Sequence, residues 1–210
     1  MYFELFKPQN WRKRSGEARR RNDAVLPWTY YSKLRQDLQP GAKKGIMSPK
    51  EGISMTRTNV MRLLDAAKIH YRTAEYAFDE NDLSGLHAAE GIGMPPEQIF
   101  KTLVAHGERC GYAVFCIPVC CELDLKKAAK AAGDKKIELI HVKDLLATTG
   151  YIRGGCSPIG MKKPFPTYLD ETAELYDEIG VSAGQRGCQI LLAPADLIGY
   201  VGCGVCDLTE

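Results

Sequence analysis

Apolar residues recur with a helical period from about residue 58 onward. Val60, Leu63, Leu64 and Ala67 fall at positions i, i+3, i+4 and i+7, behind a threonine, Thr58, that can cap the first turn. This spacing predicts a helix that ends at about residue 68. Similar stripes, with Pro in a first turn or Gly at an end, predict further helices at 84–91, 94–98, 123–133, 142–147 and after 194.

Alternating and continuous apolar runs predict strands between these helices. Residues 98–106 and 111–119 are separated by the turn-rich sequence GERC, which predicts a hairpin. Further strands are predicted at 70–78, near 167, at 179–181 and at 188–193. Because strands and helices follow one another without a regular βαβ alternation, we expect an α/β domain of the α+β type, with a mixed, partly barrel-like sheet flanked by helices.

Charge divides the chain into two parts of opposite sign. Residues 1–54 hold 12 Lys and Arg against 5 Asp and Glu, whereas residues 55–210 hold 16 against 21. We therefore predict a basic, disordered extension at 1–54 and one compact domain at 55–210. The aromatic residues among these basic ones could instead bind nucleic acid, or the segment could be an upstream stretch, because Met55 resembles a natural start.

The sequence contains no signal for export or membrane insertion. No apolar run approaches the ~20 residues that a membrane span needs, and the first charges follow the apolar residues, which is the reverse of a secretory signal. We therefore expect a cytoplasmic protein with reduced cysteines. Cys203 and Cys206 could form half of a zinc or redox site, but the other half is not visible, and we expect flexible terminal thiols. No metal or cofactor is expected.

Lys101 is the first residue that departs from its local pattern. In the predicted strand 98–106 it stands among apolar residues on whichever face is buried. An ammonium in such a place needs a partner, and a phosphate or a developing oxyanion would keep it charged. The alternative is an edge strand whose lysine reaches water and discourages pairing with another strand.

Two glycine-rich segments could lie on either side of one ligand site, each forming one of its walls. We call residues 150–160, GYIRGGCSPIG, the first glycine loop and residues 181–187, VSAGQRG, the second glycine loop. Glycine allows positive φ and close approach of the backbone, so successive N–H groups can surround a carbonyl or phosphate oxygen. Glycine-rich loops more often only turn the chain, and neither segment has the spacing of a dinucleotide or P-loop motif.

Five segments together resemble the YbaK/EbsC branch of the prolyl-tRNA editing family. They are IFKTLV, LDLKKAAKAAG, TGYIRGGCSPIGMKK, PTYLDE and VSAGQRG, and the similarity extends from Met55 to about Val201. The resemblance implies a mixed sheet curled into a partial barrel. It also implies a deacylase that removes a wrong amino acid, cysteine in the best-known branch, from the 3′ end of a transfer RNA, with prolyl-tRNA synthetase as a further partner.

The resemblance also implies roles for individual residues. Lys101 matches the essential lysine of the family, expected near the terminal phosphate or the ester, and Gly154 and Gly155 match the loop that faces the ester carbonyl. The expected substrate-binding positions are Tyr76, Ile117, Ser157, Pro158, Gly160, Ser182, Gly184, Gly187 and Gln189. This chain has Ile117 and Gln189 where family members carry a hydroxyl and a carboxylate, so amino-acid specificity is the part least constrained by the resemblance.

The predicted site lacks an evident nucleophile and base. None of the four histidines lies near the first glycine loop in the sequence. An aminoacyl ester is already activated, so positioning and an oxyanion site can suffice. The family suggests that the thiol of the substrate cysteine attacks its own carbonyl, with a bound water as the alternative for other amino acids. Two other possibilities are a hydrolase that uses Cys156 as its nucleophile and a non-catalytic module that binds aminoacyl-tRNA or has a regulatory role.

Overall fold

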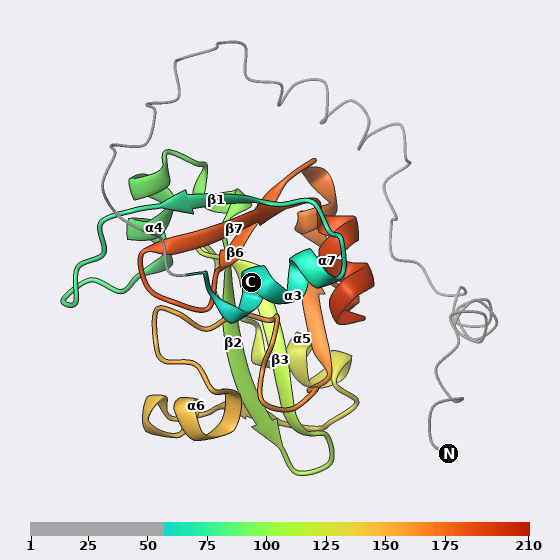
Figure 1. The fold of residues 1–210 in the computed structure, drawn as a ribbon. Coiled ribbons are helices and arrows are strands. Elements are labelled where there is room, and N and C mark those ends of the chain that lie inside the picture. The colour runs from blue at the N-terminus through green and yellow to red at the C-terminus, as the bar shows by residue number, and fades with distance from the viewer. Residues whose placement is uncertain (1–56) are drawn as a thin grey trace, which may run out of the picture. The chain divides into compact units, whose positions relative to one another are not determined.

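A computed structural model describes residues 57–210 (Figure 1). The predictions made for residues 1–54 therefore fall outside the described residues. None of the helices in the described part is long and apolar enough to cross a membrane. The described part is a mixed α+β fold, as the sequence predicts, and its strands form two sheets.

The larger sheet has five strands in the order β4-β2-β3-β5-β8. The predicted hairpin forms its centre, with β2 (Phe100–Gly107) antiparallel to β3 (Gly111–Pro118). β4 (Ile137–Leu139) pairs antiparallel with the far end of β2. β5 (Thr167–Asp170) and β8 (Gly204–Cys206) extend the other side with parallel pairing. The sheet therefore combines both kinds of pairing.

The smaller sheet has three antiparallel strands in the order β1-β7-β6. They are β1 (Arg72–Glu75), β7 (Cys188–Leu192) and β6 (Ile179–Ser182). The two sheets meet at a single-residue parallel bridge between Ile99 and Gly180. They do not close into a barrel, which corrects the partly barrel-like detail of the expected sheet. A continuous apolar core, which includes Phe100, Val181 and Ile190, connects them.

The helices begin at the predicted caps. In α3 (Asn59–Ala66) the Thr58 hydroxyl accepts a hydrogen bond from the Met61 amide at 3.3 Å, which satisfies an otherwise unpaired donor of the first turn. α4 (Gly85–Ile92) starts behind Ser84 but continues through Gly91 and ends at Gly93, which has a left-handed φ of 68°. The other helical elements are η2 (Pro96–Gln98), α5 (Leu125–Ala131), α6 (Val142–Thr149), η3 (Glu171–Leu175) and α7 (Pro194–Val201).

The C-terminal segment is ordered by pairing with the sheet, so the expectation of flexible terminal thiols was wrong. Cys206 lies in β8, and both Cys203 and Cys206 are partly buried. Leu208 is fully buried, and its amide donates a hydrogen bond to Oδ2 of Asp170 at 2.9 Å. Burial raises the pKa of Cys203 and of Cys206 to about 11. No group of three or more metal-ligating side chains occurs between residues 57 and 210.

Candidate functional site

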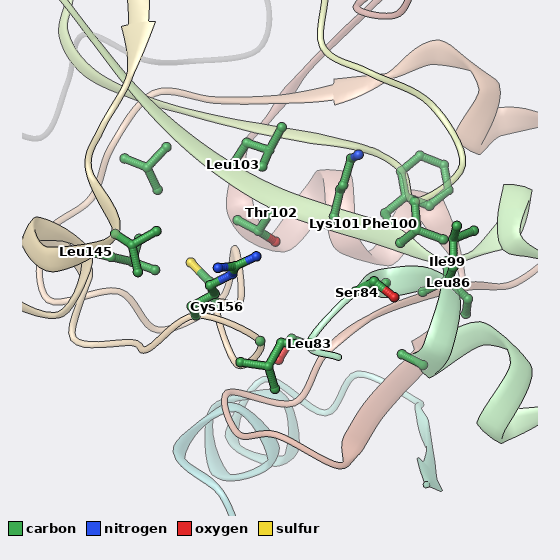
Figure 2. A pocket seen from close by; sticks show the side chains of 18 of the residues that line it. Leu83, Ser84, Leu86, Ile99, Phe100, Lys101, Thr102, Leu103, Leu145 and Cys156 are labelled. Carbon is green, nitrogen blue, oxygen red and sulfur yellow. The ribbon is translucent and has the colours of Figure 1, made fainter. Parts of the chain in front are cut away.

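A cavity of about 480 Å³ lies where the two sheets separate. Ile99 pairs with Gly180 of β6, and beyond this bridge no described residue of β6 pairs with β2. The lining comes from β2, the start of α4, the segment from β4 into α6, and the first glycine loop (Figure 2). The volume is within the range of about 300–1,000 Å³ that is usual for small-molecule sites. It therefore has room for an aminoacyl group together with part of a nucleoside.

Lys101 lines this cavity from the side of β2 that it shares with Ile117. Its side chain is 24% exposed, and Nζ lies 3.3 Å from Oε1 of Glu122. Thr102, the next residue, has its hydroxyl 3.9 Å from Cys116 Sγ on the opposite face. Figure 2 accordingly shows Lys101 rising on the opposite side of β2 from Cys156. The ammonium is thus held at the rim of the cavity, within reach of solvent and of an anionic ligand.

The edge of β2 offers backbone groups to the cavity. Residues 99–104 all line it, whereas β4 pairs with β2 from Ala105 to Gly107, and the Ile140 amide bonds to the Val104 carbonyl at 3.0 Å. Successive residues of a strand direct N–H and C=O to opposite edges, so Thr102 directs its groups to the same edge as Val104. Among the described residues, none pairs with Thr102 on that edge. Its amide therefore faces an edge that has no strand partner at this position, a feature that sequence reasoning missed.

The two glycine loops pack against each other. A side chain at Gly155 would place its Cβ 3.1 Å from the Cα of Gln185, so only glycine allows this approach without displacement. Nε of Arg186 donates a hydrogen bond to the Arg153 carbonyl at 3.0 Å and ties the loops together. Gly154, with φ of 82°, lines the cavity, whereas the Gly155 amide is already bonded to the Ile152 carbonyl at 3.0 Å. Of these two glycines, Gly154 is the one placed to meet a ligand.

Three further predicted residues line the same cavity: Tyr76, Ser182 and Gln189. Ser182 and Gln189 are directly opposite each other on β6 and β7. Oγ of Ser182 accepts a hydrogen bond from the Gly184 amide at 3.2 Å. Gln189 is 6% exposed, and its Oε1 has no hydrogen-bond partner among the described residues. The smaller sheet thus supplies the polar groups at the buried end.

The other predicted binding residues do not line the cavity, and all of them except Ile117 lie in the glycine loops. Ser157 is fully buried, and its Oγ accepts a hydrogen bond from the Ile159 amide at 3.3 Å. Ile117 is fully buried in the core that packs on α5. Pro158 is also buried in the first glycine loop. Gly160, Gly184 and Gly187 have positive φ and lie close to α3, Tyr151 and Phe78 respectively.

The sequence and the structure of this chain are similar to those of known proteins. The family model described as "Aminoacyl-tRNA editing domain" matches residues 85–200. A protein of Enterococcus faecalis named "Putative Cys-tRNA(Pro)/Cys-tRNA(Cys) deacylase EbsC" is 52% identical over 153 residues, which cover 73% of this chain and 93% of the relative. The chain belongs to the aminoacyl-tRNA editing domain family. The recognition made from the five sequence segments is confirmed.

Solved structures support the editing-domain fold. A crystal structure described as that of "a putative trans-editing enzyme for prolyl tRNA synthetase" superposes with a TM-score of 0.64 at 29% identity, over 72% of this chain and 94% of that one. A scaffold protein used for epitope grafting gives a TM-score of 0.65, also at 29% identity, over 72% of this chain and 94% of that one. The expected fold class is confirmed by these neighbours.

Cys156 in this editing domain lacks the environment of a nucleophile. The residue is only 9% exposed. Burial raises the pKa of its thiol to about 12, so the thiolate is scarce at neutral pH. Because the thiolate is the reactive form, the position of Cys156 disfavours a cysteine hydrolase.

Proposed function

We propose that this editing domain is a trans-acting deacylase that removes cysteine from Cys-tRNA(Pro). The names of the 52% identical relative and of the 29% identical structure support this substrate. The observation that carries the proposal is the cavity, which combines a cationic rim, backbone groups of β2 and of the first glycine loop, and a buried polar end. Aminoacylated tRNA is then the ligand, prolyl-tRNA synthetase a further partner, and the cytoplasm the location.

The cavity has groups for each part of the substrate. Lys101 at the rim is placed for a phosphate of the terminal nucleotides, because its present partner Glu122 is 81% exposed and easily replaced. The Gly154 and Thr102 amides can donate to the ester oxygen as negative charge develops there. The aminoacyl group then lies toward Ser182 and Gln189. This order follows the substrate from RNA backbone to amino acid.

The proposed reaction needs no nucleophile from the protein. The substrate thiol, after loss of its proton, attacks the ester carbonyl and forms a carbon–sulfur bond. The bond from the carbonyl carbon to the ribose oxygen breaks, and this oxygen takes up a proton, so that tRNA and a cysteine thiolactone are released. The protein contributes by holding the thiol near the carbonyl and by stabilising the oxyanion. An amino acid without a thiol would need a bound water instead.

A deacylation panel tests the proposal. Purified protein is mixed with Cys-tRNA(Pro), Ala-tRNA(Pro), Pro-tRNA(Pro) and Cys-tRNA(Cys), and loss of the amino acid is followed with time. We expect rapid loss from Cys-tRNA(Pro) and a decrease of roughly 10²-fold or more in kcat/KM for Lys101→Ala. Lys126→Ala, on the exposed face of α5, is the control. Binding of Cys-tRNA(Pro) without any deacylation would instead indicate a non-catalytic module.

A further inference from the structure

The amide of Gln189 is buried in the cavity without a hydrogen-bond partner for its oxygen. Gln189 lies on β7, the middle strand of the smaller sheet, between Ala74 on β1 and Ser182 on β6. It is 6% exposed, and no described residue donates to Oε1. A buried carbonyl oxygen without a donor destabilises a fold, because its lost hydration is not replaced. A ligand that brings a donor to this position would offset that cost.

The other acceptors that line the cavity are less suitable for such a ligand. Oγ of Ser182 is bonded to the Gly184 amide, and Oγ of Ser84 accepts a hydrogen bond from the His87 amide at 3.2 Å as the cap of α4. Glu122 is the sole carboxylate among the described residues that line the cavity, and it is exposed and paired with Lys101. Gln189 therefore differs from these three residues, because its side-chain oxygen is buried and has no partner among the described residues.

We propose that Oε1 of Gln189 accepts a hydrogen bond from the α-amino group of the aminoacyl ester. This inference rests on the deacylase function proposed above. The RNA must leave through the open rim, so the buried end receives the acyl portion. The α-amino group is the donor that all aminoacyl esters derived from primary amino acids share, and it is attached to the carbon beside the carbonyl. Gln189 would then select esters that carry an α-amino group and reject those in which it is missing.

A pair of ligands that differ only in the α-amino group tests this inference. The first is 3′-(cysteinylamino)-3′-deoxyadenosine, whose amide bond is not cleaved as an ester is, and the second is its 3-mercaptopropionyl analogue, which lacks the amino group. We expect the full-length protein to bind the first at least tenfold more tightly, as measured by titration calorimetry, because a site built around a hydrogen bond discriminates against a ligand that lacks the donor. Equal affinity for the two ligands would overturn the inference without requiring any catalysis.

Variants then assign the preference to Gln189. Gln189→Met keeps a similar length but cannot accept this hydrogen bond, and we expect the preference to fall below twofold. Gln98→Met removes an amide that does not line the cavity and should keep the tenfold preference. A preference that survives Gln189→Met would also overturn the inference. If this variant does not fold, the wild-type comparison alone decides. A clear preference without deacylation of Cys-tRNA(Pro) would retain the amino-group site and reject the proposed catalysis.

Discussion

The ammonium of Lys101 lies 3.3 Å from the carboxylate of Glu122 at the rim of the cavity. The two side chains are unequal partners, since Lys101 is 24% exposed and Glu122 is 81% exposed. Exposed ion pairs contribute at most about 1 kcal/mol, because water and salt screen them. The pair therefore keeps Lys101 in place while leaving it available to a phosphate.

Removal of the Glu122 charge should improve tRNA binding. In Glu122→Gln the lysine loses a competing anion and the cavity rim loses a negative charge that repels RNA, so we expect the KM for Cys-tRNA(Pro) to fall about two- to fivefold with little change in kcat. Glu138→Gln is the matched control, because it breaks the Lys136–Glu138 ion pair outside the cavity lining. An unchanged KM, or the same decrease in the control, would show that Glu122 does not compete with the RNA.

The close contact between the two glycine loops should contribute to the free energy of unfolding of the protein. Gly155→Ala places a methyl group 3.1 Å from the Gln185 backbone, and we expect it to lower the free energy of unfolding by about 1–3 kcal/mol. Gly199→Ala is the control, because nothing lies within 4 Å of a Cβ at this exposed helical position. That change should instead stabilise the protein by roughly 0.5–1 kcal/mol, since alanine favours a helix. Urea unfolding of both variants measures the difference, and equal stability would contradict the packed arrangement.

The buried thiol of Cys156 should be dispensable for deacylation. Its raised pKa of about 12 keeps it protonated through the neutral range, so a reaction through this thiolate would accelerate about tenfold for each pH unit up to that value. We expect Cys156→Ala to retain activity within about fivefold of the wild type, a margin for the altered cavity wall. If a folded Cys156→Ala variant instead retained less than roughly 1% of the wild-type activity, the cysteine hydrolase would become the better interpretation.

Local sequence patterns were sufficient for most of the fold. Thr58, Ser84 and the GERC turn each act on neighbouring residues, so the helices and the hairpin that they begin or connect could be predicted. β4 and β8 have three residues each and depend on partners distant in the chain. Such short strands carry too little periodicity to be recognised alone. The sequence also misplaced the end of α4, which continues past Gly91 and stops at the left-handed residue Gly93.

The candidate site was predictable as a set of segments but not residue by residue. Both glycine loops and Lys101 were expected near one ligand, and the loops do pack together. Which glycine faces the cavity depends on the contact between Gly155 and Gln185, which the sequence does not show. Whether a strand covers the Thr102 edge of β2 depends on how far β4 extends along β2. Long-range packing thus selects among locally equivalent residues.

The basic residues at 1–54 should supply attraction for tRNA that the acidic remainder of the chain lacks. They hold 12 Lys and Arg against 5 Asp and Glu, whereas residues 55–210 hold 16 against 21. Each phosphate neutralised by a protein cation releases counterions, so affinity falls with salt more steeply when more contacts form. Deleting residues 1–54 should therefore weaken tRNA binding and flatten the slope of log K against log salt. Deacylation of a short aminoacyl-adenosine ester, which lacks the RNA backbone, should remain unchanged and serves as the control. Identical salt slopes for the full and shortened chains would mean that the extension does not contact the RNA.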